Sequence, residues 1–404
     1  METKIFRADL YQAAELIKNG ELVAVPTETV YGLAGNGLDE RAVEKIYELK
    51  GRPAVKPLSL MVSGPQAMDS YCVDIPPQAR RLAERFWPGP LTIVLKSRET
   101  VPKLVRAGGE TVGLRCPDHP ATLKLLELTG LPLAAPSANP SGEESPKTAE
   151  KVAEYFQAKL PGIIDGGPCS LGRESSLIDM SSAPYKLLRQ GALSRERIEE
   201  ALVEGLLLVG ITGGTGCGKT TALLELEKLG ALVIDCDQVY HSLLQTSTEL
   251  IAELDSRFPG VVIDGQLDRK ALGAIVFSDA AALKELNRIS HRHVGEAVQA
   301  RLRGWAMKGG RIAAIDAIEL IGSGLGRRCA FTLAVTAPEE LRAARIMARD
   351  GISREYALMR IRAQRPDSYF EENCDYVLKN DSDKAAFVNK FNKLIKEELE
   401  KWTN

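Results

Sequence analysis

Long apolar runs and a concentration of charge of one sign are both missing from this 404-residue sequence. No stretch approaches the roughly 20 apolar residues of a membrane-spanning helix, and the start, METKIFRADLYQAAELIK, lacks the apolar core of a signal peptide. The formal net charge is −2, with 25 basic and 27 acidic residues up to Gly205 and 27 of each after it. Neither half therefore has the strong positive charge of a protein that binds nucleic acid through phosphates alone.

Paired cysteines, internal repeats and low-complexity tracts are equally absent. The seven cysteines are scattered, with no C-x-x-C pair and no metal-ligand spacing. Such a set suggests reduced thiols, so we expect a cytoplasmic protein. With 44% hydrophobic and 26% charged residues, the chain is predicted to be globular and soluble.

The length suits two domains of roughly 200 residues each. Ser194 is a good N-cap for a helix over 195–204, and Gly205 would end that helix. The apolar run LLLVGI (206–211) is typical of a buried parallel strand. We therefore predict a domain over 1–204 joined closely to a second domain over 205–404.

The stretch VGITGGTGCGKTTALL (209–224) fits the phosphate-binding pattern G-x-x-x-x-G-K-[ST]. Its glycines let backbone N–H groups point at phosphate oxygens, and the helix that follows directs its N-terminus at the same anion. Lys219 would reach the β- and γ-phosphates of ATP, and Thr220 would ligate Mg²⁺. A glycine-rich turn without nucleotide is the weaker alternative, because a buried strand precedes the loop and a helix follows it. The predicted ATP-binding residues are Gly213, Gly214, Thr215, Gly216, Cys217, Gly218, Lys219, Thr220 and Thr221.

Two aspartates, Asp235 and Asp237, end the next predicted strand, at the edge where ligands bind in open α/β sheets. Asp237 is a candidate to accept the proton of an acceptor hydroxyl, or an N-cap of the following helix, and the residues alone favour neither. Further on, Arg342, Arg345 and Arg349 recur on one helical face. A near absence of acids facing these arginines favours a lid over the transferred phosphoryl group rather than a solvated charged face.

At this point the second half resembles the dephospho-CoA kinase family. The segments TGGTGCGKTT, LGALVIDCDQVYH, LDRKALGAIVF, RIMARDGIS and CDYVLKND occur in that family's order and spacing, over nearly all of residues 206–400. The resemblance implies transfer of the ATP γ-phosphate to the 3′-hydroxyl of dephospho-CoA. It places the general base at Asp237, the P-loop lysine at Lys219 and the lid arginines at Arg345 and Arg349.

Two stretches depart from that family's pattern. The usual His-Pro appears as Ser-His-Arg-His (290–293), and the usual DVPLLFE appears as DAIELIGSGL (316–325), which keeps Asp316. Both lie nearer the acceptor pocket than the P-loop, so another small nucleotide or sugar remains the alternative acceptor. Because His291 and His293 at i, i+2 on a helix point apart, we expect a surface or capping role for them and not a metal site.

The first half alternates strand-like and helical segments, which predicts an α/β domain with a mixed sheet. We expect strands at 21–26, 57–62, 91–95, 111–115, 131–136, 175–180 and 185–189, and helices at 41–50 and 149–156. Hydroxyl and basic side chains gather where strands end. Five cations near short polar loops could hold a polyphosphate and a carboxylate, although each alone is typical of a solvated surface residue. They are Lys50, Arg52, Lys56, Arg115 and Arg189.

This half is similar to the YrdC-type threonylcarbamoyl-AMP synthase family over about residues 5–200. The similarity lies in VAVPTETVYGLAGNG, IYELKGRPAVKPLSLMV, FWPGPLTIVL, GLRCPDHP, AAPSANPSG, IIDGG and LLRQGA. The family's K-x-R signature falls on Lys50 and Arg52, and its S-x-N signature on Ser137 and Asn139. Its usual Ser-Thr appears as Ser175-Ser176, and the kinase-like half stands in place of the additional C-terminal domain of longer members.

The resemblance implies condensation of L-threonine, bicarbonate and ATP, with Mg²⁺, into threonylcarbamoyl-AMP and pyrophosphate. A carbamate carboxylate would attack the α-phosphorus, so catalysis is mostly positioning and charge neutralisation, with Lys50 and Arg52 as catalytic groups. A separate transferase would then use the product to modify tRNA. The implied ATP ligands are Lys50, Arg52, Lys56, Ser137, Asn139 and Arg189, and the implied threonine ligands are Thr29, Tyr31, Arg115 and Ser175.

The sequence thus predicts an α/β protein, in which a YrdC-like mixed-sheet domain precedes a P-loop kinase domain with a mostly parallel sheet and a helical lid. The leading hypothesis is a bifunctional enzyme. In the alternative, the first half is an RNA-binding module, since YrdC-like domains resemble proteins proposed to hold double-stranded RNA. The near-neutral charge of that half argues against RNA binding as its main role.

Overall fold

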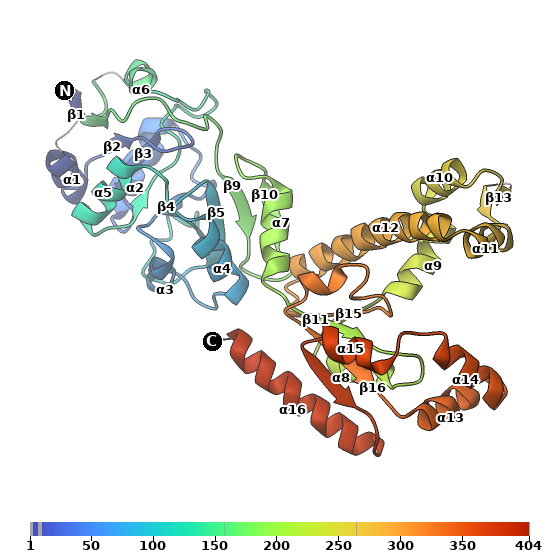
Figure 1. Cartoon of the computed structure of the whole chain (residues 1–404). Helices are drawn as coiled ribbons and strands as arrows, with labels where there is room; N and C mark the ends of the chain where they lie inside the picture. The colour runs from blue at the N-terminus through green and yellow to red at the C-terminus, as the bar shows by residue number, and fades with distance from the viewer. Residues whose placement is uncertain (1–2, 7–9, 157, 264, 404) are drawn as a thin grey trace. The chain divides into compact units, whose positions relative to one another are not determined.

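The chain divides into two compact units in the computed structural model, which describes residues 3–6, 10–156, 158–263 and 265–403. The first unit comprises Met1–Gly205 with Met307–Gly309, and the second comprises Leu206–Ala306 with Gly310–Asn404. Figure 1 colours the first unit from blue to green and most of the second from green to red. No helix among the described residues is both long and apolar enough to cross a membrane.

The first unit is built on a mixed sheet. Within the described residues ten strands pair in the order β1-β8-β2-β3-β7-β4-β6-β5-β9-β10. Parallel pairs such as β4 with β6 and β5 with β9 alternate with antiparallel pairs such as β5 with β6. The strands are β1 (Lys4–Phe6), β2 (Val23–Val25), β3 (Gly32–Asn36), β4 (Ser59–Met61), β5 (Leu91–Lys96), β6 (Thr111–Arg115), β7 (Leu133–Ala134), β8 (Gly162–Ile164), β9 (Ser176–Asp179) and β10 (Lys186–Arg189).

Helices of the first unit cover this sheet and set the positions of two basic residues. They are α1 (Leu10–Lys18), α2 (Glu40–Lys50), η1 (Pro65–Ala67), α3 (Met68–Tyr71), α4 (Pro77–Phe86), α5 (Pro120–Thr129), α6 (Ala149–Phe156) and α7 (Arg195–Glu204). Asp39 caps the start of α2 by accepting from the Arg41 N–H, and Gly51 ends it with a left-handed φ of 58°. This turn separates Lys50, on the last turn of α2, from Arg52 in the following loop.

The second unit has a parallel sheet flanked by helices. Its described strands pair in the order β12-β15-β11-β16-β17, and every pair is parallel. They are β11 (Leu207–Thr212), β12 (Leu232–Asp235), β15 (Ile312–Asp316), β16 (Phe331–Thr336) and β17 (Tyr376–Lys379), with a separate pair β13 (Val262–Ile263) and β14 (Gln266–Leu267). Because all five strands run in the same direction, their carboxyl ends share one edge, which is where ligands bind in such sheets.

The core of the second unit lies between this sheet and two helices that pack against each other, α8 and α16 (Figure 1). Leu223 and Leu226 of α8 meet Phe387, Phe391 and Ile395 of α16 in one buried cluster. A second cluster joins the helices α9 to α12. The helices are α8 (Lys219–Lys228), α9 (Cys236–Thr246), α10 (Thr248–Arg257), α11 (Arg269–Ser278), α12 (Ala280–Met307), η2 (Leu325–Arg328), α13 (Glu339–Asp350), α14 (Arg354–Arg362), α15 (Asp367–Asn373) and α16 (Lys384–Thr403).

The predicted fold class is confirmed: both units are α/β, the first with a mixed sheet and the second with a parallel one. The helix expected over 195–204 is α7, and β11 begins two residues after its C-cap. The short strands β1, β3 and β8 were not predicted. Glycine occurs in both β3 and β8, and glycine is depleted in strands, which weakens the signal that propensity gives.

Candidate active sites

A cavity opens in the first unit among β3, β4, β5, β6 and β10. Its polar lining includes six of the side chains predicted from the sequence: Tyr31, Arg52, Arg115, Ser137, Ser175 and Arg189. Ser59, Thr92 and Glu174 also line it and were not predicted, and Val30, Leu58 and Met61 form its apolar part. Polar groups that converge on one cavity can fix the orientation of a small-molecule ligand.

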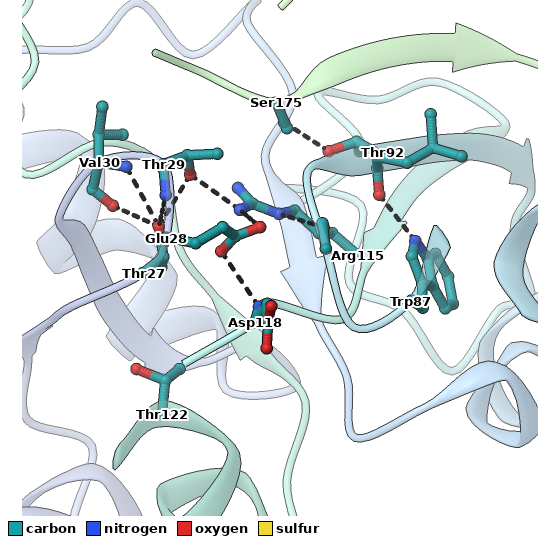
Figure 2. Close-up of polar contacts among 12 residues, drawn as sticks. Thr27, Glu28, Thr29, Val30, Trp87, Thr92, Arg115, Asp118, Thr122 and Ser175 are labelled. Atoms are coloured by element: carbon teal, nitrogen blue, oxygen red, sulfur yellow. Dashed lines mark hydrogen bonds and ion pairs between the residues drawn. The ribbon is translucent and has the colours of Figure 1, made fainter. Parts of the chain in front are cut away.

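Arg115, at the end of β6, is held in the cavity wall by a buried network that Figure 2 shows. Its Nη2 lies 2.7 Å from Oε1 of Glu28 and donates to Thr29 Oγ1 at 2.8 Å, while Nε donates to the Gly89 carbonyl at 3.3 Å. The second oxygen of Glu28 accepts from the backbone N–H of Asp118 at 3.1 Å. Because the described bonds use only Nε and Nη2, the Nη1 edge of the guanidinium is left for an anionic ligand.

Thr29 is fully buried and lies in this network rather than in the cavity lining. Its hydroxyl is 2.8 Å from that of Thr27, whose own hydroxyl donates to the Val30 carbonyl at 2.6 Å. The turn made by these residues fixes the backbone beside Arg115. Tyr31 donates its hydroxyl to the Gly167 carbonyl at 2.8 Å, and burial raises the pKa of Tyr31 to about 12. Its phenol therefore stays protonated at neutral pH.

Ser175 joins two sides of the cavity. Its hydroxyl is 2.9 Å from Thr92 Oγ1 and accepts from Arg189 Nη2 at 3.3 Å. Arg189 also lies 2.5 Å from Glu174, whose other oxygen accepts from Ser145 at 3.2 Å. In the next position, Ser176 donates to the Leu193 carbonyl and accepts from Gly191 N–H at 2.8 Å. The Ser176 hydroxyl, which stands where the family usually has that of threonine, therefore bonds to backbone groups of the protein.

Lys50 lies behind the cavity rather than in its lining. Its ammonium donates to the carbonyls of Ser137 and Asn139, and so ties α2 to the S-x-N segment. Burial, helped by the nearby Arg52, lowers the pKa of Lys50 to about 8. Arg52 donates to the carbonyls of Lys56 and Pro57, and burial lowers its pKa as well. Lys50 therefore joins α2 to the S-x-N segment, whereas Arg52 lines the cavity.

Two further predicted ATP ligands do not line the cavity. Lys56 is exposed, and its carbonyl accepts from Arg52 and Tyr47. Asn139 is buried and donates to the Pro140 and Glu143 carbonyls, while its Oδ1 has no partner among the described residues.

The predicted phosphate-binding loop connects β11 to α8 in the second unit. Gly213, Gly216 and Gly218 have φ values of 133°, 80° and 105°, which glycine alone adopts without strain. Lys219 donates to the Gly213 carbonyl at 2.9 Å, so its ammonium folds over the loop. Asn380 follows β17, donates to the Cys217 carbonyl at 2.8 Å, and occupies the space that a side chain at Gly218 would need.

Three carboxylates gather at the carboxyl edge of the sheet near Lys219. Asp235 is the N-cap of α9, accepting from the N–H groups of Asp237 and Gln238, so the capping role falls to Asp235. Burial raises the pKa of Asp237, and Asp235 adds to the rise while Lys219 and His241 oppose it. This leaves Asp237, in the first turn of α9, as the candidate general base.

Asp316 ends β15 opposite Asp235 in the sheet register. Burial raises its pKa to about 6, against the attraction of Lys219. Its Oδ1 is buried without a hydrogen-bond partner among the described residues. A Mg²⁺ ion that arrives with a nucleotide takes one or two protein oxygens beside the phosphates, and the Asp316 carboxylate with the Thr220 hydroxyl fits that need. Within the described ranges, no group of three His, Cys, Asp or Glu side chains could hold a metal.

The three arginines of α13 divide into two roles. Arg342 is buried and donates to the Thr215 carbonyl at 3.0 Å, and Arg345 donates to the carbonyls of Gly216 and Cys217 at 3.2 and 3.3 Å. Both therefore support the phosphate-binding loop. Arg349 instead pairs with its neighbour Asp350 at 2.6 Å.

The expectation that acids are nearly absent around these arginines was wrong. Arg342 lies 3.3 Å from Asp367 of α15, and Arg360 joins Arg349 on Asp350. Asp367 belongs to α15, so the residue pattern of α13 alone could not reveal it as the partner of Arg342.

The expected surface or capping role for His291 and His293 is also only partly met. Both lie within α12, away from its ends, so neither caps a helix. His293 is mostly buried and its Nε2 is 2.8 Å from Glu253 of α10, which also pairs with Arg292. His291 lies on a different side of the helix, where it lines a separate cleft.

Two family models match the chain. The Sua5/YciO/YrdC model, described as telomere recombination, matches residues 15–191, and the CoaE model, described as dephospho-CoA kinase, matches residues 207–386. The threonylcarbamoyl-AMP synthases of Pyrococcus abyssi and Bacillus subtilis are 50% and 44% identical over 192 residues, which cover 48% and 47% of this chain. This chain spans 56% of the length of each of them.

A putative threonylcarbamoyl-AMP synthase of Methanocaldococcus jannaschii is 34% identical over 182 residues, which cover 45% of this chain and 85% of that protein. Among solved structures, P. abyssi Sua5 complexed with L-threonine is 30% identical, with a TM-score of 0.48 and coverage of 81% of this chain and 96% of that one. A dephospho-CoA kinase from Campylobacter jejuni is 25% identical, with a TM-score of 0.36 and coverage of 47% and 96%. The chain therefore belongs to the Sua5/YciO/YrdC family through its first half, and its second half matches the dephospho-CoA kinase model, both being families of enzymes.

Proposed function

We propose that this chain is a bifunctional enzyme. Its first unit condenses L-threonine, bicarbonate and ATP into threonylcarbamoyl-AMP with release of pyrophosphate, for use by a separate tRNA-modifying transferase. Its second unit transfers the γ-phosphate of ATP to the 3′-hydroxyl of dephospho-CoA. The family assignments support both activities in general, and the two sets of side chains support the particular reactions.

The observation that carries the first activity is the distribution of charge around the cavity. Arg115, Arg52 and Arg189 line the cavity together with Ser137 and Ser175. A guanidinium suits the carboxylate of threonine, and two more suit the phosphates of ATP. The reaction forms a bond between a carbamate oxygen and the α-phosphorus and breaks the bond to pyrophosphate, so the protein supplies positioning and charge neutralisation.

The observation that carries the second activity is the convergence of Lys219, Asp237 and Asp316 at one edge of a parallel sheet. Asp237 accepts the proton of the attacking hydroxyl, and Lys219 moves from the Gly213 carbonyl to the phosphates. Mg²⁺, held through Thr220 and Asp316, neutralises phosphate charge when it is bound. Arg345 keeps the loop in shape, and Arg349 is released from Asp350 to meet the transferred group.

The test follows the fate of ATP phosphates in the purified chain with Mg²⁺ and one acceptor set at a time. We expect ADP only with dephospho-CoA, and pyrophosphate only with threonine plus bicarbonate. Pyrophosphate without ADP would mean that the second unit has another acceptor. ADP without pyrophosphate would favour the RNA-binding alternative for the first unit, which a salt-sensitive gel shift with double-stranded RNA would then test.

A further inference from the structure

Thr215, in the first half of the phosphate-binding loop, is held by two side chains from much later in the chain. Its backbone N–H donates to Oε1 of Gln364 at 2.8 Å, and its hydroxyl accepts from Nε2 of Gln364 at 2.7 Å. Its carbonyl accepts from Nε of Arg342 at 3.0 Å. Gln364 lies in the turn after α14 and Arg342 lies on α13, which are 149 and 127 residues away in the sequence.

The orientation of the Gln364 amide is set by its partners. The Thr215 N–H and the Arg342 guanidinium can only donate, so both must face the amide oxygen, and Nη2 of Arg342 donates to Oε1 at 3.1 Å. The amide nitrogen then faces the Thr215 hydroxyl. The backbone N–H of Gln364 donates to the Ile361 carbonyl at 3.2 Å, and α13 packs against α14 (Figure 1). Gln364 and Arg342 are therefore presented to the loop as a pair.

Gly214 gives independent evidence that this contact is close. The phosphate-binding pattern requires glycine at positions 213 and 218 but leaves position 214 open. A Cβ at Gly214 would overlap Nη2 of Arg342 and would lie 3.1 Å from Oε1 of Gln364. The close approach of these two side chains therefore accounts for a glycine that the motif itself does not require.

The contact bears on phosphate binding because such loops hold phosphates through backbone N–H groups, whose directions depend on the conformation of the loop. Arg345 and Asn380 hold the second half of the loop through the Gly216 and Cys217 carbonyls. Gln364 holds the first half through the N–H of Thr215, which leaves the N–H groups that follow to meet the anion.

We propose that Gln364 is a positioning residue of the kinase site, which fixes the phosphate-binding loop through Thr215. The inference rests on the proposed kinase function. Gln364 acts on the loop and not on the nucleotide, so its loss should weaken the binding of a nucleotide in proportion to the phosphates that the loop holds. ATP carries the β- and γ-phosphates that this type of loop binds, whereas AMP lacks both.

The experiment compares Gln364→Met with Gln299→Met in the full chain. Gln364→Met keeps the length of the side chain and removes its three polar contacts. Gln299→Met is a matched control, because it makes the same substitution at another amide of the second unit that accepts from an arginine, Arg328, at 3.0 Å. Urea unfolding of each variant checks that the fold is kept.

Two kinds of measurement are made on each variant. Initial rates of ADP release give the KM for ATP, the KM for dephospho-CoA and the inhibition constant of AMP against ATP at saturating dephospho-CoA. Amide hydrogen exchange of the peptide over residues 209–222 is followed without nucleotide and with increasing amounts of a non-hydrolysable ATP analogue, which reports on this loop without turnover.

We expect Gln364→Met to raise the KM for ATP at least tenfold, with the KM for dephospho-CoA and the inhibition constant of AMP within twofold of the wild type. Without nucleotide, the loop peptide should exchange faster than in the wild type, because the N–H of Thr215 loses its acceptor. Gln299→Met should leave the KM for ATP and the exchange of the loop unchanged.

A KM for ATP within twofold of the wild type in Gln364→Met overturns the proposal, and so does an equal weakening of ATP and AMP, which would indicate a general structural role. If the wild type does not phosphorylate dephospho-CoA, the kinase function fails, and the exchange measurements decide on Gln364. The proposal then holds if Gln364→Met needs at least tenfold more analogue to protect the loop peptide, and it fails if the same amount protects both proteins.

Discussion

Glu28 and Arg115 form a buried ion pair, with Oε1 of the carboxylate 2.7 Å from Nη2 of the guanidinium and both side chains less than 10% exposed. The two residues are 87 positions apart, on a turn before β3 and at the end of β6. Glu28 thereby fixes the plane of a guanidinium that faces the cavity.

The first prediction concerns Glu28→Gln. Removing one partner of a buried pair leaves the other charge uncompensated, which costs about 3 kcal/mol of unfolding free energy. We also expect the KM for threonine to rise about tenfold, because Arg115 loses its fixed orientation. Urea unfolding and threonine-dependent pyrophosphate release measure the two effects.

A matched control for Glu28→Gln is Asp69→Asn, which removes a carboxylate from an exposed pair with Arg80. Exposed pairs contribute at most about 1 kcal/mol, so this variant should keep both stability and activity. An unchanged KM for threonine in Glu28→Gln would remove Glu28 from the positioning of Arg115.

The second prediction is that Lys50→Ala abolishes synthase activity and leaves kinase activity intact. Its ammonium joins α2 to the Ser137 and Asn139 carbonyls, and a methyl group cannot replace those bonds. Parallel assays of pyrophosphate and ADP release measure this. A synthase rate equal to that of the wild type would show that this cross-link is dispensable.

The third prediction is the converse change, Lys219→Ala. The variant should lose kinase activity, by a factor of about 10³ or more, because no other described side chain has the P-loop lysine's position over the phosphates. Synthase activity should remain at the wild-type level, since Lys219 belongs to the second unit. Loss of both activities would contradict independent sites.

The fourth prediction separates two arginines of one helix. Arg345→Ala should raise the KM for ATP, because Arg345 holds the carbonyls of Gly216 and Cys217. Arg349→Ala should lower kcat by about a hundredfold with little change in the KM for ATP, because its role would begin only when the phosphoryl group is transferred. Initial-rate measurements over a range of ATP concentrations distinguish the two patterns, and equal effects on KM would contradict them.

The fifth prediction concerns pH and Asp316. Burial raises its folded pKa to about 6, above the value of 3.8 for an unperturbed aspartate, so the folded state binds more protons than the unfolded state between these pH values. Stability should therefore fall as pH rises from about 4 to 6, by about 3 kcal/mol at most from this group. Asp316→Asn should remove this dependence.

Urea unfolding of the wild type and of Asp316→Asn at several pH values between 4 and 7 tests this sign. The difference in unfolding free energy between the two proteins should grow in favour of the variant as pH rises through 6. A constant difference would mean that Asp316 does not titrate in this window.

Local patterns in the sequence were sufficient for most of the fold. The phosphate-binding loop needs a strand, glycines at fixed positions and a helix, and all are contiguous, so the strand and the helix on either side of the loop were predicted correctly. The helix over 149–156 and the strand over 111–115 likewise have the predicted bounds, because their own residues specify their periodicity.

The cavity of the first unit could be predicted only in part, because contacts between distant segments decide it. Glu28 and Glu174 belong to no sequence motif that marks them as residues of a site. Their partners, Arg115 and Arg189, are 87 and 15 residues away in the sequence. Lys50 was expected among the phosphate ligands because the family's K-x-R signature falls on Lys50 and Arg52. The left-handed turn at Gly51 sends the two cations to different places, and the sequence spacing does not express that turn.

Asn380 occupies the space beside Gly218 and also bonds the Cys217 carbonyl and Arg345. One amide from a strand end thus completes a loop that lies more than 160 residues earlier. A side chain at position 218 would need a smaller residue at 380, and a smaller residue at 380 would remove one hydrogen bond from the Cys217 carbonyl and one from Arg345. Across relatives, positions 218 and 380 should therefore change together or not at all. The glycine motif thus depends on a residue far outside its own stretch of sequence.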